Sequence, residues 1–440
     1  MRILKDFGAS FGSALLITVF TTVGGILSAR LLGPSGRGAL TAALLWPSTL
    51  AALGNLGLIE SMTYFSARRT SDSREVLSSG LAIAAALSVA VMIIGYFAFP
   101  YILGKYGNEE IRTARWCLAF VPLNLLALAL SAHVLGTGRI VAYSFARSAV
   151  HVATVLAMIA LFATNHASVR TFAFAAVFAN GISFTYWIVL SKSDLVRLPA
   201  VRWRTVIELM IYGIKVHLGV LASLMNLRLD QLLMSVLVAP EALGFYVVGV
   251  AIAGVVNLPA SAMIMATFPR IAGALDRDEQ VRMFGQATRI AVSMCGAIAL
   301  VFVIGAPYLI RVLFGAAYLP AVGPSRILIA AAIPLALVMQ IEAGLKALNH
   351  PEVPSYGEAI GLVITGISLA VLLPRLGTMG AAIASLLGYS STAAFLALLL
   401  KTRTGLSGWT LLHPRATDWE AAVALYRQFR MAVQVPVSEM

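Results

Sequence analysis

The sequence predicts an all-α polytopic membrane protein of about twelve transmembrane helices, arranged as two six-helix lobes with a pseudo-two-fold parallel repeat. Three observations support this fold class. The chain of 440 residues is 60% hydrophobic and 12% charged, with a mean hydropathy of +0.89, which is not the composition of a soluble globular protein. Apolar runs of about 20 residues, long enough to cross a bilayer, alternate with short connections. A short motif also recurs in the two halves of the chain.

The apolar runs define the expected spans in order, because each approaches the roughly 20 residues that the hydrocarbon core requires. The expected bounds are 10–31, 39–64, 77–99, 116–135, 143–163, 171–191, 209–236, 243–268, 287–306, 326–346, 357–373 and 379–400. The connections contain helix breakers such as Gly33-Pro34, Pro240, Pro351 and Pro374. No small-residue cleavage site precedes the first span, so we expect a retained helix rather than a signal peptide.

The repeated motif relates the two halves. Leu-Leu-Gly-Pro-Ser-Gly-Arg-Gly (31–38) follows the first span and Leu-Val-Ala-Pro-Glu-Ala-Leu-Gly (237–244) follows the seventh. Six spans separate the copies, and an even number gives both halves the same orientation, with a site between them. We therefore expect an N-lobe over 1–200 with helices 1–6 and a C-lobe over 201–400 with helices 7–12. Residues 401–440 are expected to form a cytoplasmic tail.

The charge pattern predicts orientation. The formal net charge is +13, but the basic residues are scattered between apolar runs rather than clustered in an arm. With both termini cytoplasmic, 21 of the 32 Lys and Arg residues fall on the inner side and 9 on the outer side. The positive-inside rule therefore favours cytoplasmic N and C termini, and it explains the net charge without a nucleic-acid partner.

The tail and the cysteines have simple interpretations. One arc of a helix over 419–433 gathers Trp419, Tyr426 and Phe429 with several aliphatic residues, which suggests an interfacial amphipathic helix on the inner leaflet. A disordered or partner-binding tail remains open. Cys117 and Cys295 lie in separate apolar runs without disulfide or metal spacing, so we expect packing residues.

The seventh span carries an unusual number of polar residues, namely Lys215, His217, Asn226, Arg228 and Asp230. An ionised group near the centre of a span costs roughly 2.5–3.5 kcal/mol on insertion scales. At 100° per residue, Lys215, Asn226 and Asp230 share one arc, and His217 and Arg228 share another. One face is expected to line a hydrated cavity and the other to meet a neighbouring helix. The alternative is that Arg228 and Asp230 lie near the outer mouth and extend to water.

Catalytic motifs are absent from the sequence. It contains no phosphate-binding loop with lysine, no H-E-x-x-H, no G-x-S-x-G and no paired cysteine motif. We therefore expect a protein that is not an enzyme and that uses no cofactor or bound metal, with proton or sodium coupling left open. Asp230, Glu60 and Glu342 are the coupling candidates, although Glu342 has the spacing to pair with Lys346.

The unpaired charges at membrane depth are mostly cationic, through Arg30, Lys215 and Arg228 against Asp230. Guanidinium groups suit phosphate oxygens in particular, so a cationic cavity favours an anionic substrate. The predicted substrate-binding residues are Arg30, Lys215, Asn226, Arg228 and Asp230.

Several short motifs resemble those of a known family. They are Ser-Ala-Arg-Leu-Leu-Gly-Pro-Ser-Gly-Arg-Gly (28–38), Leu-Arg-Leu-Asp-Gln (227–231) with Leu-Gly-Phe-Tyr (243–246), Phe-Pro-Arg-Ile-Ala (268–272), Leu-Phe-Gly-Ala-Ala-Tyr-Leu-Pro-Ala (313–321) and Leu-Gly-Thr-Met-Gly-Ala-Ala (376–382). In this order and spacing the chain resembles polysaccharide flippases of the multidrug/oligosaccharidyl-lipid/polysaccharide (MOP) superfamily. The resemblance covers nearly the whole chain.

This resemblance implies a two-lobed, alternating-access protein of the bacterial cytoplasmic membrane. It implies translocation of undecaprenyl-pyrophosphate-linked oligosaccharide units from the inner to the outer leaflet, for surface or exopolysaccharide synthesis. It also implies that Arg30, Arg228 and Asp230 contribute to the central cavity. The implied partners are the anionic lipid-linked oligosaccharide, membrane lipids, and polysaccharide polymerase and export proteins.

Other functions remain open. A multidrug or cation antiporter of the same fold should carry membrane carboxylates in spans 1–6, where only Glu60 lies at depth. A flippase for the peptidoglycan precursor usually has two further spans, whereas here a tail that contains many polar residues follows Leu400. A membrane polymerase or ligase would need a large outer loop with acid–base groups, and none is visible.

Overall fold

The computed structural model describes residues 2–68, 73–406 and 408–413, and every regular element in this part of the chain is helical. Cys117 and Cys295 are free and buried, in agreement with the expectation of packing residues. The predicted tail helix over 419–433 lies outside the described residues.

The helices follow the expected spans with longer ends. They are α1 (Arg2–Gly54), α2 (Leu58–Arg68), α3 (Ser73–Ile102), α4 (Asn108–Cys117), α5 (Phe120–Gly136), α6 (Ile140–Ala163), α7 (Val169–Leu190), α8 (Lys192–Leu195), α9 (Trp203–Leu237), α10 (Pro240–Val256), α11 (Leu258–Gly273), α12 (Arg277–Leu313), the 3₁₀ helix η1 (Ala316–Ala321), α13 (Val322–Ala347), α14 (Val353–Thr404) and α15 (Gly408–Leu412).

Two of these helices are sharply bent and cross the membrane twice. Ten helical segments of the described chain are long and apolar enough to span a bilayer. The two longest bend at Gly33 (φ 67°) in α1 and at Gly377 (φ 56°) in α14, a backbone region that favours glycine. Across the bend in α1 the two legs are joined by a hydrogen bond, which Arg37 Nη1 donates to Ser28 Oγ over 2.8 Å. The ten segments therefore supply twelve crossings, as predicted.

Three expected spans are interrupted, which the sequence pattern did not predict. The second breaks at residues 55–57, the fourth at 118–119 and the eighth at Asn257. At the first break Leu56 (φ 46°) and Gly57 (φ 72°) both adopt positive φ. A Cβ on Gly57 would lie 2.0 Å from the carbonyl oxygen of Gly213, so this break lets α9 approach the backbone closely. Hydropathy measures how apolar a segment is, and it does not show where the helical backbone is interrupted within that segment.

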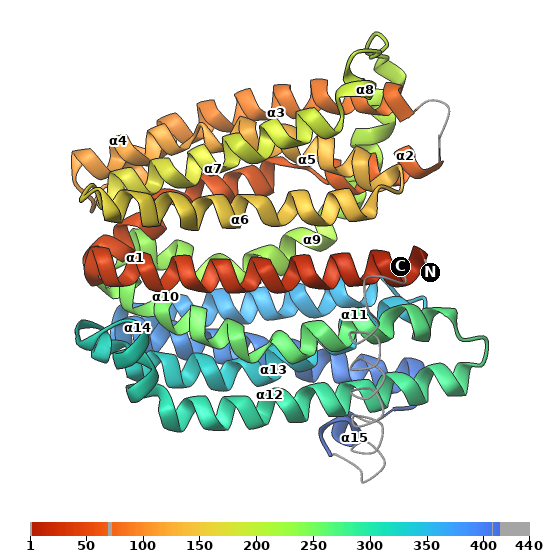
Figure 1. Cartoon of the computed structure of the whole chain (residues 1–440). Coiled ribbons are helices and arrows are strands. Elements are labelled where there is room, and N and C mark those ends of the chain that lie inside the picture. Colours follow the sequence, from red (N-terminus) through yellow and green to blue (C-terminus); the bar gives the residue numbers. More distant parts are fainter. Residues whose placement is uncertain (1, 69–72, 407, 414–440) are drawn as a thin grey trace, which may run out of the picture.

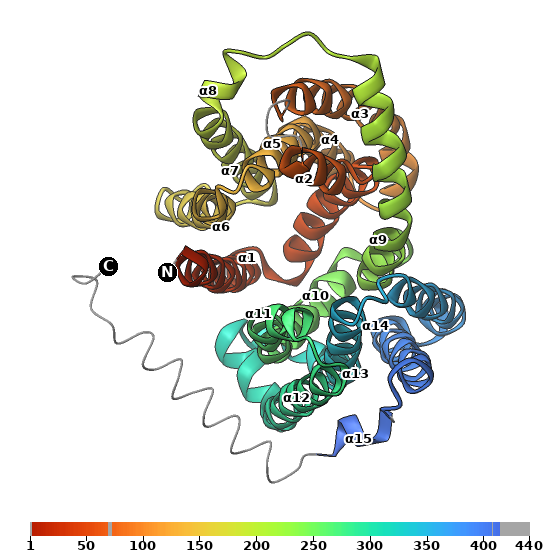
Figure 2. The same cartoon turned by 90° about the vertical axis from the view of Figure 1, so that its right-hand side faces the viewer.

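The helices group into two halves (Figure 2), here called the N-lobe (α1–α7) and the C-lobe (α9–α14). Within the described chain, all extensive contacts between the two lobes involve α1 or α9. Figure 1 shows the start of α1 at one end of the bundle and its bend at the other. We call these the proximal end and the distal end.

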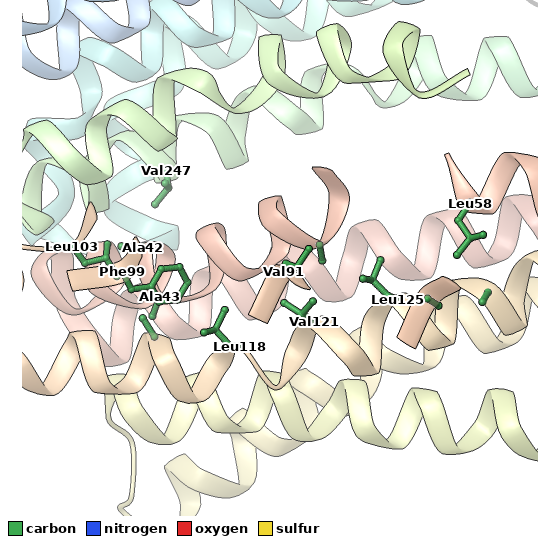
Figure 3. Close-up of a cluster of buried hydrophobic side chains, with 14 of the residues drawn as sticks. Ala42, Ala43, Leu58, Val91, Phe99, Leu103, Leu118, Val121, Leu125 and Val247 are labelled. Atoms are coloured by element: carbon green, nitrogen blue, oxygen red, sulfur yellow. The ribbon is translucent and has the colours of Figure 1, made fainter. Parts of the chain in front are cut away.

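Small and medium apolar side chains fill the interior. The largest buried cluster joins α1, α3 and α5, and Figure 3 shows Ala42, Ala43, Phe99 and Leu118 among its members. Val247 of α10 belongs to the same cluster, so this core extends into the C-lobe. Alanine and serine at such contacts let helix backbones approach closely, as is common in membranes.

Large apolar side chains cover the outer faces of the helices. On α3 and α12 several of these side chains are more than half exposed, as expected of surfaces that meet lipid rather than water. They include Val89, Ile93, Phe97, Leu300, Val301 and Ile304. The chain is therefore a multi-pass membrane protein.

Candidate functional site

The second leg of α1 and the helix α9 run side by side and join the two lobes through polar contacts. We call this contact the interlobe seam. Its hydrogen bonds are His217 Nε2 with Leu53 O (3.1 Å), Arg228 Nη1 with Ser48 Oγ and Thr49 Oγ1 (3.2 Å each), and Trp46 Nε1 with Ser235 Oγ (2.9 Å). The face of α9 that carries His217 and Arg228 thus meets α1, and the face that carries Asn226 and Asp230 is also packed against neighbouring helices, where a hydrated cavity was one expectation.

Arg228 is the charged member of the seam. Its side chain is partly buried, and its hydrogen-bond partners are the hydroxyl groups of Ser48 and Thr49. No carboxylate pairs with it in the part of the chain that the structure describes. A guanidinium has five N–H donors, so two hydroxyl groups leave most of its capacity unused. Arg228 therefore keeps N–H donors that these two hydroxyl groups do not use.

The distal end of the lobe contact is closed by the repeated motif packing against itself. A Cβ on Gly38 would lie 1.7 Å from the carbonyl oxygen of Pro240, and one on Gly244 would lie 2.0 Å from that of Pro34. Each copy of the motif therefore places its glycine against the proline of the other copy. Only glycine allows the two backbones to meet at this distance.

Arg30 strengthens the same distal closure. Its Nε donates to Leu313 O over 2.7 Å, and its Nη2 donates to Val312 O, at the C-terminus of α12. Nearby, the hydroxyl of Tyr318 donates to Ala29 O over 3.0 Å. A cation at a helix C-terminus satisfies free carbonyls and favours the helix dipole. The structure thus places Arg30 on a C-lobe helix end, away from Arg228.

Asp230 lies inside the C-lobe and is 3% exposed. Its carboxylate accepts hydrogen bonds from the hydroxyl of Tyr246, from Ser385 Oγ (3.0 Å) and from the backbone N–H of Gln231 (2.7 Å). These donors come from α9, α10 and α14, so the carboxylate ties three helices together. A buried carboxylate without a paired cation is costly, and hydrogen bonds of this kind offset the cost.

A second polar network continues one turn along α9. Asn226 Nδ2 donates to Glu358 Oε2 over 2.8 Å, and Asn226 Oδ1 accepts from Thr365 Oγ1 over 3.0 Å. Ser223 Oγ donates to the other oxygen of Glu358 over 3.3 Å. Glu358 therefore links α9 to the first leg of α14.

Glu342 of α13 belongs to the same region. It interacts with Glu358, and its Oε2 lies 3.4 Å from Lys346 Nζ, the pair expected from their spacing. Two carboxyl groups and one ammonium group therefore lie together at the proximal side of the C-lobe.

An aromatic cluster joins the lobes nearer the proximal end. The rings of Tyr64 on α2 and Tyr212 on α9 stack with centroids 4.7 Å apart. Arg68 donates to the hydroxyl of Tyr64, and Glu60 lies one turn before Tyr64 on the same helix. Glu60 Oε2 is buried without a hydrogen-bond partner among the described residues. The opposite face of α2, with Leu58 and Met62, is fully buried.

The predicted site residues thus fall into separate places. Asn226 and Asp230 face the interior of the C-lobe, Arg228 faces the seam and Arg30 the distal closure. Lys215 is exposed and joins none of these groups.

Sequence reasoning missed Tyr64, Tyr212, Tyr246 and Ser385, which lack the charge that made the others conspicuous. Tyr246 alone had a signal, because it ends the Leu-Gly-Phe-Tyr motif after span 7.

Twelve crossings in two lobes that meet along a polar seam define a helical membrane protein with the fold of the MOP superfamily. Residues 3–274 match the family described as polysaccharide biosynthesis protein, which is more than half of the chain. The chain belongs to this family, as its motifs predicted. Among curated protein sequences no match was found.

Solved structures share the fold at low sequence identity. The lipid II flippase MurJ in an inward closed conformation superposes with a TM-score of 0.75 at 14% identity, covering 90% of this chain and 87% of MurJ. An inward-facing multidrug resistance MATE family transporter gives 0.69 at 16% identity, covering 88% and 94%. A MOP superfamily transporter from Pyrococcus furiosus gives 0.65 at 14% identity, covering 92% and 95%. These likenesses concern the fold.

Proposed function

We propose that this protein translocates undecaprenyl-pyrophosphate-linked oligosaccharide units from the inner to the outer leaflet of the bacterial cytoplasmic membrane. Membership of the polysaccharide biosynthesis family supports a role in glycan assembly. The proposal rests on the observation that the guanidinium of Arg228 lies between the lobes and has neutral hydroxyl groups as its hydrogen-bond partners. A pyrophosphate can displace those hydroxyl groups and bind the guanidinium through two oxygens at once.

The glycan would meet the aromatic cluster. Tyr64 and Tyr212 offer ring faces, which suit the apolar faces of sugar rings, once the lobes part and the two rings separate. Glu60 has an unused carboxylate oxygen that can accept hydrogen bonds from sugar hydroxyl groups. Charged and aromatic groups would thus contact different parts of the same substrate.

Movement between the lobes would follow alternating access. With both termini cytoplasmic, the distal end faces outward, and its close glycine contacts correspond to a state closed to the outside. The seam consists of hydrogen bonds to hydroxyl and carbonyl groups, each of which stabilises by about 0.5–1.5 kcal/mol. Contacts of this size can be broken and remade as the lobes rock about an axis along the membrane normal.

Coupling to an ion gradient would use the C-lobe carboxylates. Asp230 is buried with hydroxyl and N–H donors and has no cationic partner in the described chain. Uptake of a proton or a sodium ion would neutralise it and alter the packing of α9, α10 and α14. Glu342, beside Glu358 and Lys346, and Glu60 are the other candidates.

The test of function is the lipid composition of a strain that lacks this chain. Extracts should contain an accumulated lipid-linked oligosaccharide on the inner leaflet, and the wild-type chain should relieve the accumulation. Analysis of the accumulated glycan by mass spectrometry would identify the substrate. A strain without accumulation but with changed sensitivity to cationic drugs would favour the multidrug antiporter. Accumulated peptidoglycan precursor would favour the alternative precursor flippase.

Asp230→Asn is expected to abolish export while the protein folds and reaches the membrane. Asparagine keeps an oxygen that accepts from Tyr246 and Ser385 but cannot carry the exchangeable charge. Asp230→Ala should also abolish export and in addition lower thermal stability, because an unpaired buried hydroxyl costs about 1–3 kcal/mol. Export in vesicles with imposed proton or sodium gradients, together with melting temperatures, checks both variants. Wild-type export by Asp230→Asn would show that the role of Asp230 is structural and that its charge is not needed for transport.

A further inference from the structure

A separate groove of about 540 Å³ runs along the outer face of the C-lobe, between α13 and the second leg of α14. Its volume lies within the range of about 300–1,000 Å³ that is usual for ligand pockets. It shares no residue with the interlobe seam or with the polar networks. The lining residues are Ile333, Pro334, Leu337, Leu386, Ser390, Ala393, Ala394, Ala397, Leu398, Lys401 and Gly408.

The groove follows from small residues on one helix face. Ala393, Ala394 and Ala397 leave space beside α13, where Pro334 cannot donate a backbone hydrogen bond. The short helix α15 forms its proximal wall. A Cβ on Gly408 would lie 2.6 Å from Ala397 Cβ, and Leu411 is fully buried, so α15 is packed firmly against this helix.

The groove is shorter than the bilayer core. Its lining on α14 runs from Leu386 to Lys401, fifteen residues apart on a continuous helix, which corresponds to about 22 Å of rise. A typical hydrocarbon core is about 30 Å thick. Apart from Ser390 the lining between these two residues is apolar, so the groove suits one acyl chain that enters from the proximal side. The much longer isoprenoid chain of the proposed substrate would exceed it.

The groove ends at a cation. Lys401 is exposed, lies in the last turn of α14 and forms no ion pair among the described residues. A lysine at the end of a transmembrane helix places its ammonium group at the level of the lipid head groups. Its charge is complementary to a phosphate whose acyl chain lies in the groove.

We propose that this groove is a binding site for an anionic phospholipid of the leaflet at the proximal end. One acyl chain lies between α13 and α14, and the head-group phosphate contacts Lys401. The lipid thereby fills the space beside Pro334 and holds α15 against the C-lobe. This site does not depend on the proposed transport function.

Native mass spectrometry of the purified full chain tests the proposal, with phosphatidylglycerol and phosphatidylethanolamine of the same acyl chains as probes. The wild-type chain is expected to retain phosphatidylglycerol preferentially. Lys401→Gln should reduce that retention about fivefold, the contribution of one lysine near a lipid surface. Ala394→Trp, which fills the groove, should remove retention of both lipids.

Two matched variants serve as controls. Arg403→Gln removes an exposed cation of the same helix turn that does not line the groove, and Leu387→Trp enlarges an exposed side chain outside it. Both should bind phosphatidylglycerol as the wild type does. Equal retention of the two lipids by the wild type, or an equal effect of Lys401→Gln and Arg403→Gln, would overturn the proposal. Since Lys401 is exposed, its replacement keeps the test decisive even where Ala394→Trp fails to fold.

Discussion

Replacing either Gly38 or Gly244 with alanine is expected to abolish export by preventing closure of the distal end. The new Cβ would lie 1.7 Å or 2.0 Å from a backbone carbonyl oxygen of the opposite motif, so the lobes must separate locally. Overpacking of this kind costs about 1–3 kcal/mol, enough to change the population of a closed state about 5–150-fold. Spin labels at Arg112 and Leu319, both exposed near the distal end, should report a longer mean distance.

Other glycines of the same helices provide the control. A Cβ on Gly254 of α10 would have no atom within 4 Å, and one on Gly25 of α1 would meet only Arg37 Nη2 at 3.8 Å. Gly254→Ala and Gly25→Ala should therefore export normally and leave the label distance unchanged. If Gly38→Ala behaves like Gly254→Ala in both measurements, the reciprocal contact is not required for closure.

Arg228→Ala is expected to abolish export while the protein still reaches the membrane. Hydrogen bonds to a charged group contribute about 1.5–3 kcal/mol, so loss of this guanidinium should reduce transport about ten- to hundredfold. Ser48 Oγ keeps its hydrogen bond to Leu45 O (2.9 Å), whereas the buried hydroxyl of Thr49 loses its partner, so a loss of stability of about 1–3 kcal/mol is expected beside the loss of export. Accumulation of lipid-linked oligosaccharide in a complemented deletion strain, with the amount of protein in the membrane, measures the effect.

Two further variants separate charge from geometry. Arg228→Lys keeps the charge but loses the planar fork, so we expect partial export. Arg311→Ala removes an exposed guanidinium of α12, and export should be normal. Wild-type export by Arg228→Ala would exclude this residue from substrate recognition and leave the flippase proposal without its central observation.

The number of crossings was predictable because each crossing needs a long apolar run. The repeat was predictable because its proline and last glycine keep their register. The interruption at 55–57 was not, since Leu56 adopts positive φ without being glycine. At this break the backbone of Leu56 and Gly57 lies against Gly213, which is far away in the sequence.

For the candidate site, the sequence predicted only the angular position of each polar residue around α9. Periodicity separated Arg228 from Asn226 and Asp230, and the structure places them on different sides of α9. Periodicity does not show which helix packs against each face. The interior position of Asp230 could therefore not be predicted without knowing where α10 and α14 pack. Arg30 shows the same limit, because its partners are carbonyl groups 282 and 283 residues away.

The reciprocal contact of Gly38 with Pro240 and of Gly244 with Pro34 has the form of an isologous interface contained in one polypeptide. In such an interface a surface meets an equivalent copy of itself, so each half depends on a feature that the other half also carries. The closed distal end therefore needs both copies of the motif, and a change in either copy alone is enough to disturb it. Outside this motif the two halves differ, since Tyr64 and Glu60 lie in the N-lobe whereas Asp230 and Glu358 lie in the C-lobe.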